Sequence, residues 1–345
     1  MMAIFGWLFG AKPKPRSGAP KPQPSSNAPT NAPQTRPAKK SASLPDIRDL
    51  GSDMLAIPAL DFFGVYRRSP NDRFRVAWRD GHGARGGARD AGEGHYVLID
   101  DDRIVAHGRM QRPNDGKVAD NGNFILNDWR FTAELSGTFW AFKADGSPIL
   151  SQPFAANLFN NGLSADGTFA ACHTCNSGSE SDSAVLAIFD LSRGKELTRF
   201  RAESGWPNTY EFLPDERILR LGYANGEGEF AYTLNGEFIE RDRWISARLE
   251  RGDLYMVRSL LDEADGKPAD NMATRLLSAI DAGLSHGNWR DDQSQALGWR
   301  LRGEVLESMG APSEALECYE KALKLNPKIG IKRRIGQLQK VLAAK

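Results

Sequence analysis

Two stretches in the middle of the chain, LSADGTFAACHTC (163–175) and LAIFDLSRGKELTRF (186–200), decide the fold. Both are short runs of β-type residues bounded by Gly, Asp and Ser, the pattern of strands joined by tight turns. In the first stretch a turn residue, Asp166, stands three positions before a large apolar residue, Phe169. The arrangement recurs as Asn71 with Phe74, Asn121 with Phe124 and Asp215 with Ile218, so the turn residues are 50, 45 and 49 positions apart. The spacing predicts four similar β units.

Each unit continues with a second apolar run and a turn, after which an apolar strand resumes. The second runs are 96–99, 140–142, 185–189 and 230–232, and the strands resume at Ile104, Ile149, Leu197 and Phe238 with Ile239. Repeats of about 40 to 50 residues with several strands each are typical of propeller blades. The region from about Leu55 to Trp244 resembles WD40-like and related bacterial β-propellers, which implies a small four-unit β-propeller-like domain.

The strand Leu60 to Tyr66 is expected to close this ring by pairing with the last unit, because closure removes exposed sheet edges. A β-sandwich or an open β-meander stays an alternative, since the four units are only loosely alike.

The pattern becomes helical after Ile245. Asp253 is a suitable N-cap for a helix that ends near Ala264, with apolar residues along one face. A second helix is expected after Pro268, because Met272, Leu276, Ile280 and Leu284 form a stripe.

The stretch SQALGWRLRGEVLESMGAPSEALECYEKALKLNP (294–327) predicts a helical hairpin. It resembles a tetratricopeptide repeat, because eight residues stand at the spacing of that family: Trp299, Gly303, Leu306, Gly310, Ala315, Tyr319, Ala322 and Pro327. Arg302 departs from the pattern, which usually has Leu there. One repeat cannot bury both of its faces, so the preceding helices and an amphipathic tail, 329–342, are expected to complete the layer.

The resemblance implies a partner-binding face on the first helix of the repeat. The positions that line the concave face in the family correspond to Leu297, Arg300, Glu304 and Ser308. The residues that clamp a peptide carboxylate in part of the family are not matched here. The alternative is an exposed salt-bridged face, because Arg300 and Glu304 are four positions apart on one helix.

The N-terminal region has a different composition. Residues 1–10 are apolar and uncharged, and Ile4, Phe5, Trp7, Leu8 and Phe9 are candidates for a membrane or partner anchor. Residues 11–50 are rich in proline and basic residues, which predicts a linker without ordered structure. The expected domains are therefore the peptide 1–10, the linker 11–50, a β-repeat domain 51–246 and a helical TPR-like domain 247–345.

Charge and cysteine content narrow the functional classes. Residues 1–45 hold seven basic and no acidic residues, whereas the whole chain has a net charge of +1, so the body is mildly acidic. This argues against a nucleic-acid-binding core, which needs clustered Lys and Arg on a folded face. Three cysteines are too few to staple a secreted fold. We expect a cytoplasmic protein whose residues 1–16 can contact the inner face of a membrane.

Three motifs suggest chemistry, and each has a simpler interpretation. The cluster 172–175 (Cys-His-Thr-Cys) offers too few ligands for a structural zinc site, so buried strand cysteines are expected, with zinc or redox chemistry as the alternative. The stretch 81–86 fits GxGxxG but leads into a strand rather than a helix, so an inter-strand loop is expected. The aspartates 100–102 lack the remainder of a calcium loop, which favours a solvated turn. No cofactor and no metal site are predicted.

These observations predict a non-enzymatic scaffold or adaptor that binds other proteins through its β-repeat and TPR-like surfaces. Repeat folds favour this function because they present broad, rigid surfaces. The alternative is a ligand receptor or enzyme with a site at the mouth of the propeller, built from residues such as Arg79, His82, Arg130 or Trp206. The oligomeric state is left open.

Overall fold

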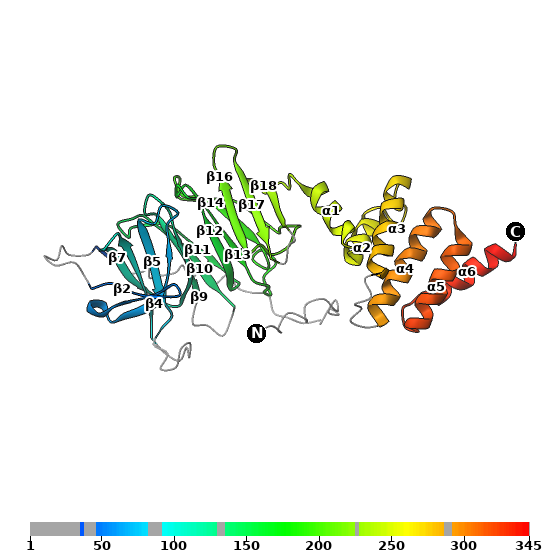
Figure 1. Ribbon diagram of the computed structural model, residues 1–345, viewed down its shortest axis with the longest axis horizontal. Helices are drawn as coiled ribbons and strands as arrows, with labels where there is room; N and C mark the ends of the chain where they lie inside the picture. Colours follow the sequence, from blue (N-terminus) through cyan, green and yellow to red (C-terminus); the bar gives the residue numbers. More distant parts are fainter. Residues whose placement is uncertain are drawn as a thin grey trace, which may run out of the picture. The chain divides into compact units, whose positions relative to one another are not determined.

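The computed structural model describes residues 35–37, 46–81, 92–129, 135–224, 228–285 and 292–344. Within these residues, four antiparallel sheets are followed by six α-helices (Figure 1). The prediction of β units followed by helices is therefore confirmed. The candidate anchor residues Ile4, Phe5, Trp7, Leu8 and Phe9 lie outside the described residues.

The strands follow chain order within most of the sheets. In spatial order the first sheet contains β1 (Thr35–Pro37), β7 (Arg103–Met110), β6 (Gly94–Asp100), β5 (Phe74–Arg79), β4 (Phe62–Arg68), β3 (Met54–Ile57) and β2 (Arg48–Gly51). The second contains β11 (Pro148–Phe154), β10 (Gly137–Phe142), β9 (Phe124–Trp129) and β8 (Pro113–Val118). The third contains β12 (Leu158–Leu163), β13 (Phe169–Thr174), β14 (Leu186–Asp190) and β15 (Lys195–Phe200), and the fourth β16 (Thr209–Leu213), β17 (Ile218–Tyr223) and β18 (Gly228–Thr233).

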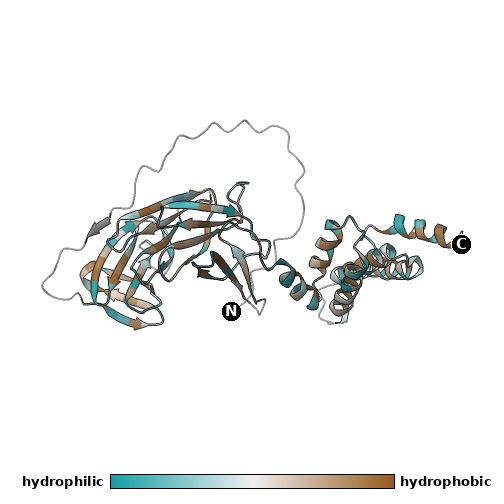
Figure 2. Ribbon diagram, turned by 90° about the horizontal axis from the view of Figure 1, so that it is seen from above, coloured by the Kyte–Doolittle hydropathy of each residue, from teal (hydrophilic) through white to brown (hydrophobic). Residues whose placement is uncertain are grey.

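The predicted turns begin the second strand of each unit. Strands β5, β9, β13 and β17 start at Phe74, Phe124, Phe169 and Ile218, the apolar residues identified from the spacing. Alternate residues of β9 face different neighbours: Phe124 and Leu126 pack in the core between the first and second sheets, and Ile125 in the core between the second and third. Strands buried on both faces read as continuous apolar runs, which Figure 2 shows as brown ribbon.

Hydrogen bonds join each repeat to the next at equivalent positions. The backbone N–H of Asn71 donates to Asp120 Oδ1 (2.8 Å), and Asn121 Nδ2 donates to the carbonyl of Asp166 (2.8 Å). Between the third and fourth sheets, the Tyr210 hydroxyl donates to Asn160 Oδ1 (2.5 Å). The partners are 49, 45 and 50 residues apart, which is one repeat. Residues one repeat apart thus meet where neighbouring sheets adjoin.

The prediction that 60–66 closes a ring is wrong. Strand β4 pairs with β3 and β5 inside the first sheet. Strand β3 thereby helps to form an apolar cluster on the far face of that sheet, with Leu55 and Ile57 fully buried. On the fourth sheet, the face turned away from the third carries an exposed ion pair between Arg220 and Glu211. No strand pairing joins the first and fourth sheets in the described ranges, so the array is open.

The fourth sheet also lacks the outer strand expected at Phe238 and Ile239. Only an isolated bridge joins Tyr232 to Phe238. The Phe238 ring stacks on Tyr232 at 4.3 Å and contacts Trp244 at 5.7 Å, between ring centroids. The segment is a connector because its aromatic residue packs against both the sheet and the first helix.

Two segments in the range expected to lack ordered structure form strands. Strand β1 pairs with β7, so that Arg36 is opposite His107 in register, and β2 pairs with β3. Backbone pairing at both edges of the first sheet offsets the ordering entropy that the composition alone does not overcome.

The helices are α1 (Arg241–Glu250), α2 (Leu254–Glu263), α3 (Asp270–Ser285), α4 (Asp292–Ser308), α5 (Pro312–Leu325) and α6 (Lys332–Ala343). The predicted N-cap is confirmed, because Asp253 accepts from the backbone N–H groups of Tyr255 and Met256. Helix α1 was not predicted, although Trp244 and Ile245 are buried in the helical core. In the α4–α5 hairpin, Gly303 packs on the ring of Tyr319, as the repeat pattern requires.

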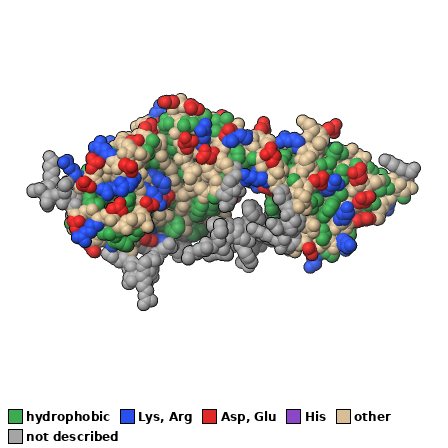
Figure 3. Space-filling view, viewed as in Figure 1, with side chains coloured by type: hydrophobic (Ala, Val, Ile, Leu, Met, Phe, Trp, Pro, Cys, Tyr) green, Lys and Arg blue, Asp and Glu red, His purple; other side chains and the backbone are tan. Residues whose placement is uncertain are grey.

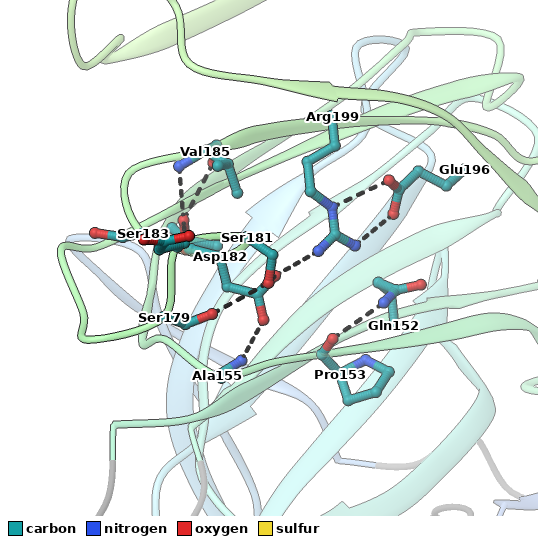
Figure 4. A network of polar contacts seen from close by, with 12 residues as sticks. Gln152, Pro153, Ala155, Ser179, Ser181, Asp182, Ser183, Val185, Glu196 and Arg199 are labelled. Carbon is teal, nitrogen blue, oxygen red and sulfur yellow. Dashed lines mark hydrogen bonds and ion pairs between the residues drawn. The ribbon is translucent and has the colours of Figure 1, made fainter. Parts of the chain in front are cut away.

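A network of polar contacts holds the loop between β13 and β14 (Figure 4). Arg199 Nη1 contacts Asp182 Oδ1 at 2.5 Å, and Arg199 Nη2 contacts Glu196 Oε2 at 2.7 Å. Asp182 Oδ2 also accepts from the backbone N–H of Ala155 (2.7 Å), next to the end of the second sheet. The Asp182 side chain, 11% exposed, therefore connects the loop to two sheets.

Replacing Asp182 by Ala should lower the free energy of unfolding by about 2–3 kcal/mol, because a mostly buried Arg199 is left with one carboxylate. Glu211→Ala removes one partner of an exposed ion pair and should lower the free energy of unfolding by only about 0–1 kcal/mol. Urea unfolding measures both variants, and equal losses would contradict the assignment of Asp182 as the structural carboxylate.

Glycine-to-alanine changes at two helical positions should have opposite effects. A Cβ on Gly303 would lie 2.5 Å from Tyr319 Cε1, whereas nothing lies within 4 Å of one on Gly336. Gly336→Ala should stabilise by up to about 1 kcal/mol through helix propensity. Gly303→Ala should destabilise by about 1–2 kcal/mol through overpacking. Thermal unfolding compares them, and stabilisation by Gly303→Ala would refute the close approach.

Candidate functional site

The four residues predicted to bind a partner lie along one stripe of α4. Leu297 packs against the core of the helical region. Arg300 donates from Nε to Glu304 Oε1 (2.8 Å) and from Nη1 to the carbonyl of Ile329 (3.1 Å). Ser308 donates its hydroxyl to the carbonyl of Val305 in its own helix (2.6 Å). The structure thus joins Arg300 to Glu304 and leaves Ser308 apart from that pair.

Helix α2 contributes the other half of this surface. Leu254 on α2 is close to Gly298 on α4, since a Cβ on Gly298 would lie 3.2 Å from Leu254 Cδ1. Further along the same two helices, Arg258 Nη1 lies 2.8 Å from Glu304 Oε2. Glu304 is therefore shared between two arginines, one from each helix.

An exposed aromatic residue lies on the same stripe of α2. Tyr255 is 69% exposed and stands three positions before Arg258, which also contacts Asp262 Oδ1 at 3.6 Å. Residues three and seven positions apart share a helix face. We call the surface formed by Tyr255, Arg258, Leu297, Arg300, Glu304 and Ser308 the α2–α4 face.

Sequence reasoning missed Tyr255 and Arg258, although the signal was present. The helix was predicted with Leu254, Val257 and Leu261 as its buried stripe, and all three are buried. Tyr255 and Arg258 form the stripe beside it. The sequence did not show that α4 lies beside this stripe, because that contact depends on how the two helices pack.

The charges of the α2–α4 face compensate one another. Arg258 and Arg300 both contact Glu304, whose side chain is 25% exposed. Partly exposed ion pairs contribute little to stability, about 0–1 kcal/mol each, so a partner's charges can replace them at small cost. Figure 3 shows acidic and basic side chains interspersed with apolar ones over the helices. The face suits a partner segment that supplies an apolar group and charges of both signs.

The Cys-His-Thr-Cys cluster is part of a packed strand. Cys172 is fully buried in the core between the second and third sheets. His173 points to the other face, where its ring lies 5.2 Å from that of Trp206. Burial raises the pKa of the Cys172 thiol well above its usual range and lowers the pKa of His173 to about 4. The prediction of buried strand cysteines is therefore confirmed for Cys172, whereas Cys175 follows the end of β13 and is half-buried.

Metal ligands are not clustered in the part of the chain that the structure describes: no three His, Cys, Asp or Glu residues there could hold an ion together. Asp100 ends β6 and pairs with Arg73 Nε at 2.6 Å, while Asp101 and Asp102 are exposed, which confirms the turn. Of the GxGxxG stretch only Gly81 is described.

Two of the four residues proposed for a propeller mouth, Arg79 and Trp206, are described, and they belong to different sheets. Arg79 ends β5 in the first sheet, whereas Trp206 lies beside His173 of the third. His82 and Arg130 lie outside the described residues. Among the helices that are described, none has both the length and the apolar composition needed to cross a bilayer.

Comparison with known proteins identifies a family for the C-terminal hairpin. The tetratricopeptide repeat family model matches residues 296–329, which confirms the resemblance of the α4–α5 hairpin. No curated protein matches the chain.

Solved structures similar to the chain include hydrazine synthase from Kuenenia stuttgartiensis (10% identity, TM-score 0.34, 52% of this chain and 64% of that one) and Hsv2 from Kluyvelomyces marxianus (10%, 0.34, 54% and 55%). The Dos1 propeller is a third (11%, 0.35, 52% and 47%). The chain thus spans less than two thirds of each of these proteins.

Proposed function

We propose that this protein is a non-enzymatic scaffold or adaptor that binds a segment of another protein on its α2–α4 face. Tetratricopeptide repeats and β-propellers generally mediate protein–protein interactions, and the repeat at 296–329 supplies one helix of the face. The β sheets act as a rigid support in this proposal. The α2–α4 face consists of the four α4 residues inferred from the repeat and two further residues, Tyr255 and Arg258, on α2.

The observation that carries the proposal is the exposure of Tyr255. Its side chain is 69% exposed on a helix whose neighbouring stripe is buried. Tyrosine and arginine are enriched among the residues that dominate binding energy at protein interfaces. Here Tyr255 stands one turn from Arg258, whose guanidinium is held by Glu304 at 2.8 Å. An exposed aromatic residue beside positioned arginines is the arrangement expected of an anchor point.

Changing Tyr255 to Ala should remove the main partner without affecting the fold. Affinity capture from the lysate of its own cells, with the full chain as bait, should recover that protein with the wild type and about tenfold less with the variant. The unfolding midpoint should change little, because Tyr255 is exposed.

The matched control is Val341→Ala, which truncates a residue 49% exposed on α6. It should capture the same proteins as the wild type. If Tyr255→Ala and Val341→Ala recover identical proteins in identical amounts, the α2–α4 face is not the binding surface.

We also propose that the apolar peptide at residues 1–10 provides a second attachment, to an anionic membrane surface. Deleting these residues should reduce sedimentation with phosphatidylserine-containing vesicles, because the apolar side chains and the basic residues after them both favour such a surface. Substituting the basic residues Lys12, Lys14 and Arg16 by Gln should reduce vesicle binding less than the deletion does. The binding that is left should be insensitive to salt. An unchanged soluble fraction after the deletion would exclude membrane attachment by this peptide.

A further inference from the structure

Three basic side chains stand in a row across the first sheet. In the antiparallel register, Arg79 of β5 is opposite His95 of β6, and His95 is opposite Arg109 of β7. Residues opposite one another share a face and have Cβ atoms about 4.5–5.5 Å apart. His107 is two residues from Arg109 on the same strand, so it lies on the same face. We call these four residues the basic row.

The members of the basic row are close enough to affect one another. The rings of His95 and His107 are 5.9 Å apart, and the ring of Phe62 from β4 lies 5.4 Å from His95. Burial, with Arg109, His107 and Arg79 as further causes, lowers the pKa of His95 to about 4. His95 is therefore neutral at pH 7 between two cationic side chains. A bound anion would favour the charged form of its imidazole.

Buried polar atoms in the row lack partners. Arg79 Nε and His95 Nδ1 are buried without a hydrogen bond, and His95 as a whole is only 5% exposed. Within the described residues, no ion pair joins Arg79 or Arg109 to a carboxylate, and Glu93, just before β6, is exposed. A buried donor without an acceptor costs about 1–3 kcal/mol.

Other arginines in and beside the strands of the same sheet have carboxylate partners. Four of them each face an aspartate: Arg67 with Asp53, Arg68 with Asp49, Arg73 with Asp100 and Arg75 with Asp102, at 2.6, 3.2, 2.6 and 3.5 Å. The sheet therefore supplies carboxylates for these four arginines, whereas none of the described residues pairs with Arg79 or Arg109 in this way. Arg109 is exposed, so an anion can approach the row from solvent.

We propose that the basic row is a binding site for a phosphate group. Two arginines offer forked N–H donors that suit phosphate oxygens, and the imidazoles add further donors. A phosphate monoester carries a charge of about −1.5 to −2 at pH 7, which balances two arginines, whereas a carboxylate leaves one unbalanced. This site is separate from the α2–α4 face and does not depend on the function proposed for that face.

The test is a titration of the full chain with inorganic phosphate at constant ionic strength, followed by calorimetry and by NMR of the histidine rings. Phosphate should bind saturably and raise the pKa of His95 from about 4 toward its ordinary value, because an anion favours the charged imidazolium. Acetate at the same ionic strength should bind more weakly.

The test variant is Arg79→Gln with Arg109→Gln, and the matched control is Arg67→Gln with Arg73→Gln, which removes two arginines that already have aspartate partners. The test variant should lower phosphate affinity by about tenfold or more, and the control should leave it unchanged. The test variant should also be at least as stable to urea as the wild type, because it removes a guanidinium whose buried Nε has no acceptor. That stability separates a lost site from a misfolded protein.

Vesicles of phosphatidylcholine with and without phosphatidic acid distinguish a lipid source of the phosphate from a free one. Binding to inorganic phosphate, or to the phosphatidic acid vesicles alone, supports the proposal if the test variant loses it. An absence of saturable binding in both arms, or equal binding by the wild type and the test variant, overturns it.

Discussion

The sheets of this protein depend on hydrogen bonds between residues one repeat apart, each with a side chain on one partner and a backbone group on the other. Asn71 meets the turn at Asp120, and Asn121 meets the turn at Asp166. These hydrogen bonds fix each sheet beside the next, and an apolar core fills the space between them. Because an inner sheet is buried on both faces, its central strands begin or continue with apolar runs, as in Phe124–Leu126 of β9, and the turns carry the polar groups that position it.

The two ends of the array explain why it stays open. The first sheet covers its own far face with β3, so the apolar surface that a closing sheet would need is already used. The fourth sheet presents Arg220 and Glu211 on its far face, where an apolar surface would be required. Phe230 of this sheet packs with α1 and α2 in the helical core. The chain therefore continues from sheet to helices through a shared core.

Two surfaces differ in how their charges are balanced. On the α2–α4 face, Glu304 lies between Arg258 and Arg300, so the charges are neutralised within the chain and an exposed Tyr255 is the distinguishing feature. In the basic row, Arg79 and Arg109 flank a buried His95 without a carboxylate partner among the described residues. A compensated surface suits a protein partner, whereas an uncompensated one calls for an anion.

The sequence by itself determined the local features. The turn positions placed the starts of β5, β9, β13 and β17, Asp253 marked the start of α2, and the repeat spacing identified the α4–α5 hairpin. Each depends on residues near one another in the chain. Only the tertiary structure decided that β4 pairs within the first sheet, that Arg258 meets Glu304, and that Arg79, His95 and Arg109 form a row. These contacts depend on strand register and helix packing, which arise from the summed burial of many side chains and leave no local pattern.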